Sequence, residues 1–449
     1  MSDYSQSAKR PPRRLPGALL AEALLIEAVL VAIVLLGNLR QHAILFIVLG
    51  LGSAAVYWCA IRSAHHAAQS LLARQLRWWV LVPALVFRGT LLFSPPSLSD
   101  DIFRYLWDGT VLLHGINPYS HPPQDPQLAF LRGPHYEAIN YKEISTIYPP
   151  LAQLAFALGA LLDLGIWGPK AVFWCFELGL LWALARLLDL LQLGPQRLLV
   201  YAWNPLILFE FCGSAHVDVL AVLLLVLTAC AIIQERSALS TTLLGLAALV
   251  KLIPALLLPL LARWTRPLAW VLFGAWIAAG FVPFVGAGPG LVFGLREYAL
   301  RWRFNDAAFS VLHRGLLAVG LTEPTALFCG KIVVGVVLVG AVSFAALRKL
   351  TFVRGAYLVL GIYLLLSPTL QPWYLTWMVP FLCVYPNRAW VMLTGLVLVS
   401  YAILIGAGAD SQHWSEPAWT KPVQFVPFYA LLIWDAWRAR PLGSVEIGG

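Results

Sequence analysis

Two adjacent carboxylates, Asp100 and Asp101, open a polar stretch of the chain, SLSDDIFRYLWDGTVLLHGINPYSHPP. Arg104, Tyr105 and Asp108 follow at spacings that place them on one helical face with Asp101. Such a carboxylate can take a proton from a sugar hydroxyl, and a carboxylate pair can hold a divalent cation such as Mg²⁺ or Mn²⁺, although proton transfer does not require one. Ser-x-Asp-Asp is also a good helix start with an aspartate as N-cap. Considering the whole stretch, we favour a working carboxylate.

A second polar stretch, LREYALRWRFNDAAFSVLHRG, is basic. It carries Arg296, Arg301, Arg303, His313 and Arg314. Arginine suits bidentate phosphate binding. Alternatively, these arginines anchor the stretch to lipid headgroups, with Tyr298 and Trp302 as interfacial aromatics. We expect at least one of them to contact a phosphate.

Polar groups at predicted helix ends are the remaining candidates. His216 and Asp218 could bind a metal, orient a substrate or cap a helix. Lys251 interrupts an apolar run and could bind phosphate or extend to the membrane interface. Gln371, Trp373 and Tyr374 lie at another predicted helix end, where aromatic faces could stack on a sugar or form an interfacial belt.

Composition decides the class of protein that must position these groups. Hydrophobic residues make up 60% of the 449 positions and charged residues 12%, and the mean hydropathy is +0.77. A soluble domain is roughly 45–50% apolar and about 25% charged. The composition therefore predicts a polytopic membrane protein. The net charge of +9 does not indicate nucleic-acid binding, because the basic residues punctuate apolar runs.

Long apolar runs without alternation predict membrane helices, not a barrel. They lie near 17–37, 42–61, 78–94, 171–190, 198–213, 217–234, 239–262, 268–287, 326–347, 355–371, 373–386, 389–407 and 423–437. The 239–262 run contains Lys251 and two prolines, so we split it, which gives fourteen helices. We expect 147–166 to lie at the interface. If it spanned the membrane, Arg186 and Arg197 would move to the outer side, against the charge bias.

Lysine and arginine in the short connections place both termini inside and both polar stretches outside. Long loops carry function more often than short connections do. The predicted order is a basic inner tail, N-terminal helices, a first outer loop, central helices, a second outer loop, C-terminal helices and an inner tail. The respective ranges are 1–16, 17–94, 95–170, 171–287, 288–325, 326–437 and 438–449. Four acids within apolar runs receive no role: Glu22, Glu27, Glu177 and Glu210.

Several motifs in this order resemble a known family. These are the acidic pair with D-x-x-x-Y at Asp101–Tyr105, G-x-N-P-Y at Gly115–Tyr119, Y-P-P-L at Tyr148–Leu151 and N-P…H-x-D within Trp203–Leu220. They resemble the GT-C-type integral-membrane glycosyltransferases that use polyprenyl-phosphate sugars, in particular the bacterial mannosyltransferase-like branch. Relative to many members, the two helices within about 17–61 would precede the shared core.

The resemblance implies an all-α, GT-C-like bundle of about fourteen helices with two long outer loops that carry interfacial helices. It also implies an inverting transfer of a hexose, with mannose indicated by the nearest branch, to a glycolipid, glycan or protein. The enzyme would lie in the bacterial inner membrane among lipids, with its site on the periplasmic face. D-x-x-x-Y favours Asp101 over Asp100 as the base.

The candidate residues fall into two further groups. The donor phosphate would contact Arg301, Arg303, Arg296, Lys251 or Arg104. The sugar or acceptor would contact Tyr105, Asp108, Tyr119, Tyr148, His216, Asp218, His313, Gln371, Trp373 and Tyr374. A lipid-linked-sugar flippase and a non-catalytic assembly subunit are the alternatives. A transporter would place its charges near the midplane, whereas here polar residues concentrate at one surface.

Overall fold

The structure, a computed structural model, describes residues 17–261, 267–405 and 416–438. This part of the protein is built of helices joined by irregular connections. Within these ranges no β-strand forms, and Phe304 and Thr369 make an isolated bridge. The tails at 1–16 and 439–449 lie outside the described residues. The α-helices are α1 Gly17–Leu36, α2 Ala43–Ala67, α3 Ala73–Leu92, α4 Asp101–Leu113, α5 Pro150–Leu161, α6 Trp167–Leu190, α7 Leu199–Ala202, α8 Pro205–Ile207, α9 Asp218–Ile233, α10 Ser237–Ala248, α11 Pro267–Phe281, α12 Gly290–Arg301, α13 Ala308–Ala318, α14 Glu323–Leu347, α15 Phe352–Leu366, α16 Pro372–Leu375, α17 Val379–Val384, α18 Arg388–Leu396 and α19 Thr420–Arg438.

Seven 3-10 or π-helical segments are also present in the described residues. They are η1 Pro126–Leu131, η2 Tyr136–Ala138, η3 Pro195–Leu198, η4 Leu208–Gly213, η5 Ile253–Leu261, η6 Val282–Ala287 and η7 Val397–Leu404. All are 3-10 helices except η4, which is a π-helix.

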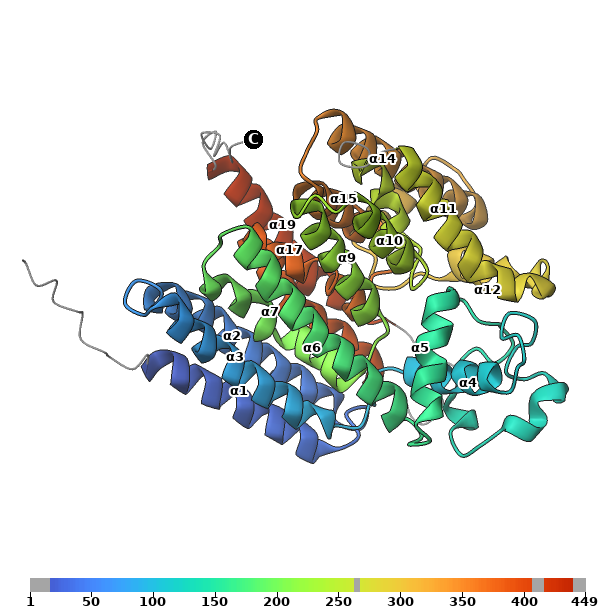
Figure 1. The fold of residues 1–449 in the computed structure, drawn as a ribbon, viewed down its shortest axis with the longest axis horizontal. Coiled ribbons are helices and arrows are strands. Elements are labelled where there is room, and N and C mark those ends of the chain that lie inside the picture. Colours follow the sequence, from blue (N-terminus) through green and yellow to red (C-terminus); the bar gives the residue numbers. More distant parts are fainter. Residues whose placement is uncertain (1–16, 262–266, 406–415, 439–449) are drawn as a thin grey trace, which may run out of the picture.

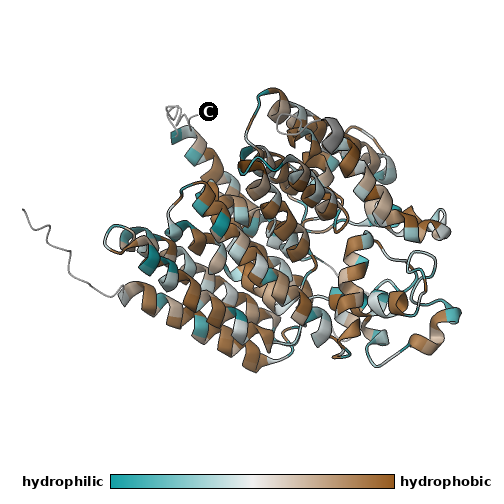
Figure 2. Cartoon of the chain, viewed as in Figure 1, coloured by the Kyte–Doolittle hydropathy of each residue, from teal (hydrophilic) through white to brown (hydrophobic). Residues whose placement is uncertain are grey.

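Within the described residues, five helices are long and apolar enough to cross a membrane. These are Gly17–Leu36, Ala43–Ala67, Trp167–Leu190, Trp270–Ala287 and Glu323–Leu347. Hydrophobic residues cover the helices along their length, as expected where lipid is the solvent (Figure 2). The prediction of an all-α polytopic membrane protein is confirmed.

The apolar run 198–213 is not the single helix that we predicted. It is divided among η3, α7, α8 and the π-helix η4. Pro205 begins α8, and the Asn204 side chain accepts a hydrogen bond from the Leu206 N–H. Proline lacks an N–H and cannot continue the preceding helix. The segment Pro205–Gly213 then meets α9 at a bend of 120°.

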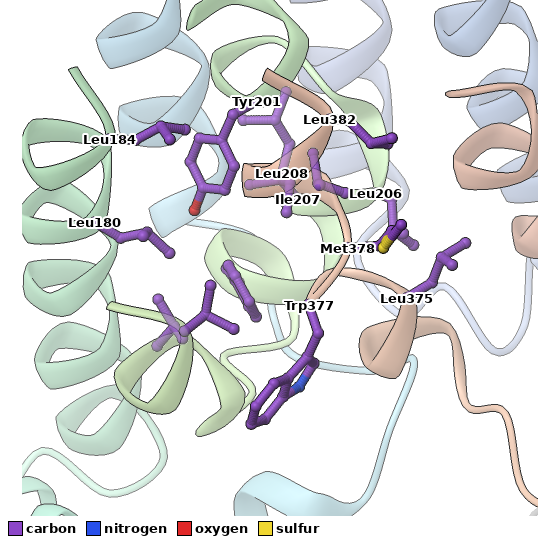
Figure 3. Close-up of a cluster of buried hydrophobic side chains, with 14 of the residues drawn as sticks. Leu180, Leu184, Tyr201, Leu206, Ile207, Leu208, Leu375, Trp377, Met378 and Leu382 are labelled. Carbon is purple, nitrogen blue, oxygen red and sulfur yellow. The ribbon is translucent and has the colours of Figure 1, made fainter. Parts of the chain in front are cut away.

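Buried polar groups join the helices of the bundle interior. Arg88 in α3 donates two hydrogen bonds to Glu177 in α6, at 2.9 and 2.6 Å, and both side chains are wholly buried. Tyr201 in α7 donates to the second Glu177 oxygen. Figure 3 shows Tyr201 beside Leu180 and Leu184 of α6, in the apolar cluster that also contains Trp377. Glu177 therefore has a structural role, since it joins α3, α6 and α7 through Arg88 and Tyr201.

Two further apolar segments do not form a helix long enough to cross a bilayer core. The helix within 147–166 is α5, whose twelve residues span about 18 Å, less than the roughly 30 Å of a bilayer core. The 239–262 run divides into α10 and η5, and Lys251 lies between them. Because Lys251 lies between the two helices, its charge is not in the middle of a membrane helix, where it would be costly.

The two long polar stretches lie at the same end of the molecule, where Figure 1 shows α4, α5 and α12. The Tyr141 ring of the first contacts the Trp302 ring of the second, with centroids 4.6 Å apart. The Asn117 side chain donates to the Phe284 carbonyl at 3.0 Å. Both stretches therefore border one region of the protein.

Candidate active site

Asp101 begins α4, and three polar side chains, one from α4 itself and two from other segments, approach one of its carboxylate oxygens. The hydroxyls of Tyr105 and Tyr148 donate to Oδ2 at 3.3 and 3.4 Å. Nδ1 of His216 lies 3.6 Å from the same oxygen. The shared face predicted for Asp101 and Tyr105 is therefore confirmed.

The surroundings of Asp101 favour its charged form. Burial alone would raise its pKa, yet the pKa is lowered below the ordinary value, because the His216 imidazole, the Lys251 ammonium and the Tyr105 hydroxyl stabilise the carboxylate. Burial raises the pKa of Tyr105 well above its usual range, as do the neighbouring Tyr148 and the Asp101 charge. The tyrosine therefore stays a donor, and Asp101 stays an acceptor.

Asp100 has a different environment. It occupies the N-cap position of α4, but its side chain makes no capping hydrogen bond and pairs instead with Arg40, in the α1–α2 connection. Burial raises the pKa of Asp100, and the Asp101 charge adds to this effect against the opposing charge of Arg40. The two adjacent acids thus differ: Asp100 is held in an ion pair with Arg40, whereas the Asp101 side chain is 22% exposed.

A break in a helix brings His216 to Asp101. Ala215, with φ +61°, lies in the turn between η4 and α9, and the His216 N–H donates to the Glu210 carbonyl at 3.1 Å. Nε2 of His216 lies 3.4 Å from Oε2 of Glu210. The His216 ring stacks on Trp373 of α16, with centroids 3.9 Å apart. His216 thus lies between two carboxylates and above an indole.

Lys251, which is partly exposed, and the buried Asp218 form a second polar group. The Lys251 ammonium lies 2.7 and 2.8 Å from the two Asp218 oxygens. The Trp377 indole N–H donates to Asp218 Oδ1 at 2.7 Å; Figure 3 shows this indole at the edge of the apolar cluster. Lys251 also lies 4.5 Å from the centre of the Tyr374 ring, whose hydroxyl is 2.6 Å from that of Tyr298 in α12. The second polar stretch therefore reaches the site through Tyr298.

Other predicted residues support these two groups. Arg104 donates to Asp108 at 2.7 Å, and both are buried on α4. The Tyr119 hydroxyl donates to the Tyr148 carbonyl at 2.7 Å. Gln371 is the N-cap residue of α16, the short helix that carries Trp373.

The arginines of the second stretch have different partners. Arg303 donates to Asp306 at 2.8 Å and lies 3.2 Å from His313, in a cluster that Lys421 of α19 completes. Arg301 is 72% exposed and pairs with Glu297 at 2.8 Å. Arg296, also on α12, is exposed. Arg303 and His313 thus lie together, but apart from the Asp101 contacts described above.

Three residues that received no role in the sequence complete the site: Arg40, Glu210 and Tyr401. The Tyr401 hydroxyl donates to Glu210 at 2.7 Å. An acid within an apolar run was the one available signal for Glu210. Among the described residues, no group of three or more His, Cys, Asp or Glu side chains is placed to hold a metal ion. The arrangement suits proton transfer next to a cation.

A family model described as "Alpha-(1->6)-mannopyranosyltransferase, N-terminal domain" matches residues 15–266, more than half of the chain. The chain belongs to this family. Alpha-(1->6)-mannopyranosyltransferase A of Mycobacterium tuberculosis is 30% identical over 195 residues, which cover 41% of this chain and 36% of that relative. The family model, over residues 15–266, covers Asp101, Glu210, His216, Asp218 and Lys251, and it also covers α1 and α2. The two helices within 17–61 are therefore part of the N-terminal domain that this mannopyranosyltransferase family shares.

Proposed function

We propose that the protein is an inverting mannosyltransferase that takes mannose from a polyprenyl-phosphate donor. The observation that carries this proposal is the partly exposed Asp101 carboxylate beside Tyr105, Tyr148 and His216, with Lys251 nearby and a pKa below its ordinary value. The family match supports the sugar. The acceptor would be a glycolipid or glycan at the outer face of the inner membrane.

In the proposed reaction, the acceptor oxygen attacks the anomeric carbon while the bond from that carbon to the phosphate oxygen breaks. The acceptor proton passes to Asp101, and polyprenyl phosphate leaves with the electron pair. The three polar side chains that approach the Asp101 carboxylate all face Oδ2, and Oδ1 has no hydrogen-bond partner among the described residues. We assign Oδ1 as the proton acceptor. A single displacement inverts the anomeric carbon.

The leaving phosphate gains charge, and a preorganised cation stabilises developing charge effectively. Lys251 is the first candidate, because Asp218 fixes its ammonium and 14% of its side chain remains exposed. Arg296 and Arg301 follow, since both lie on α12 with Tyr298. Arg303, held by Asp306, would support the loop.

Transfer by the purified protein in lipid nanodiscs tests this function. The donors are polyprenyl-phosphate mannose, glucose, galactose and arabinose, with a host lipid extract as acceptor. We expect mannose transfer that falls about 10²- to 10⁴-fold in Asp101→Asn, the usual contribution of a general base. Near-normal turnover in that variant would rule out Asp101. Failure to bind or transfer any donor would favour a transporter or an assembly subunit.

The orientation has a separate test. Single cysteines introduced near residues 110 and 310 should both react with an impermeant thiol reagent from the periplasmic side. Labelling of the two cysteines from opposite sides would contradict an active site that both polar stretches form on one side of the membrane.

A further inference from the structure

Glu210 is a wholly buried carboxylate in the middle of an apolar segment, and the reaction just described does not use it. One of its oxygens accepts the Tyr401 hydroxyl at 2.7 Å. The other, Oε2, lies 3.4 Å from His216 Nε2. A continuous line of polar groups thus runs from Tyr401 through Glu210 and His216 to Asp101.

The two ring nitrogens of His216 are buried and make no hydrogen bond within the described residues, whereas buried polar atoms are almost always paired. Among the described residues, the polar groups facing them are the carboxylates of Asp101 and Glu210, at 3.6 and 3.4 Å. Trp373 covers the ring face and offers no charge. Both nitrogens therefore face acceptors, which suits an imidazolium with two N–H groups.

Charge balance leads to the same form. An isolated carboxylate is costly to bury, and a buried charge is normally paired. The nearby Lys251 already lies between the two oxygens of Asp218. His216 is thus the cation that faces Glu210 and Asp101 together.

We propose that Glu210 is a positioning residue for glycosyl transfer, which acts by holding His216 as an imidazolium oriented toward Asp101. This inference rests on the proposed function of Asp101 as the base. The Tyr401 hydroxyl fixes Glu210, Glu210 fixes the imidazolium, and the imidazolium holds Oδ2 of Asp101. The second oxygen of Asp101 then stays directed to the acceptor.

The pH dependence gives this role a specific signature. His216 faces Asp101 of α4 and Glu210 of η4, and Tyr401 of η7 donates to Glu210. Asp101 also faces Tyr105, Tyr148 and the charge of Lys251. Removing the Glu210 charge lets His216 become neutral, and Asp101 then loses a cationic neighbour. The pKa of Asp101 rises, so the activity that needs its carboxylate is lost at higher pH than in the native enzyme.

The test compares Glu210→Gln with Glu177→Gln in nanodiscs, using polyprenyl-phosphate mannose. Glu177 is an equally buried acid, but it pairs with Arg88 away from Asp101. For Glu210→Gln we expect kcat to fall about 10- to 100-fold with little change in the donor KM. We also expect the acidic limb of the pH–rate profile to move up by about one to three pH units. Glu177→Gln should lower thermal stability and leave that limb in place.

A double-variant cycle separates positioning from general support. If Glu210 acts through His216, adding Glu210→Gln to His216→Gln should cause little further loss, since the two residues work as a unit. Additive losses, or an unmoved acidic limb in a folded Glu210→Gln protein, would overturn the proposal. If Glu210→Gln does not fold, His216→Gln carries the test, and an unmoved limb there overturns it equally. A native enzyme that transfers no sugar would instead refute the proposed function.

Discussion

Replacement of Lys251 by methionine separates its two roles, counter-ion and proposed phosphate ligand. The substitution leaves Asp218, which is wholly buried, with the Trp377 indole as its remaining donor. Breaking a buried ion pair from one side costs about 3–5 kcal/mol. Lys251→Met should therefore reduce the ratio of folded to unfolded protein about a hundredfold or more.

The double variant Lys251→Met/Asp218→Asn removes both charges and keeps similar volumes. Replacing a buried pair by neutral groups is often close to neutral in stability. We therefore expect denaturant unfolding in detergent micelles to return to within about 1–2 kcal/mol of the native protein. Mannose transfer should stay about 10²- to 10³-fold below native, which is the cost of losing one group that stabilises developing charge.

The reasoning fails if the double variant regains both stability and transfer, since Lys251 would then be a counter-ion alone. It also fails if Lys251→Met unfolds like the native protein, because Asp218 would not need the ammonium. Lys251→Arg serves as the matched control. It retains the charge, so its stability should remain well above that of the methionine variant.

Further outcomes follow from the same contacts. Because the pKa of Asp101 is lowered and its ionised form is the base, kcat/KM should stay level from pH 7 down to about pH 4 in an activity profile. Asp100→Asn should lose its Arg40 pair and some stability, yet reduce turnover less than about tenfold, as kinetics and thermal unfolding would show. Gly109→Ala would place a Cβ 2.3 Å from the Phe156 carbonyl oxygen, so it should separate α4 from α5 and lower kcat, measurable by initial rates. Arg303→Ala should reduce thermal stability without raising the donor KM, because Arg303 is held by Asp306.

Helix positions were largely predictable because they depend on local apolar runs. The first run, near 17–37, became α1 Gly17–Leu36, and the run near 171–190 became α6 Trp167–Leu190. The prediction of one helix over 198–213 was wrong. Its apolar composition is continuous, but Pro205 and the packing around η4 break the helical repeat.

The site was predictable where contacts are local. Asp101 with Tyr105, and Arg104 with Asp108, are four residues apart on α4, and helix geometry brings such pairs together. Contacts between distant segments have no such signal. The hydropathy pattern does not predict the ion pair between Asp100 and Arg40. The sequence indicated Lys251 as a phosphate ligand but did not predict its ion pair with Asp218.

Three interruptions of helical order meet at the site. Asp101 follows the connection after α3, His216 lies in the break between η4 and α9, and Lys251 lies between α10 and η5. Each break leaves backbone groups outside a regular helix, which a membrane protein tolerates where they are buried in protein or line a cavity. A continuous helix through 205–233 would satisfy its backbone more simply, but it would carry His216 away from Glu210 and Asp101. The breaks are therefore best explained by the side chains that they bring together, and variants that straighten them should lose transfer before they lose the fold.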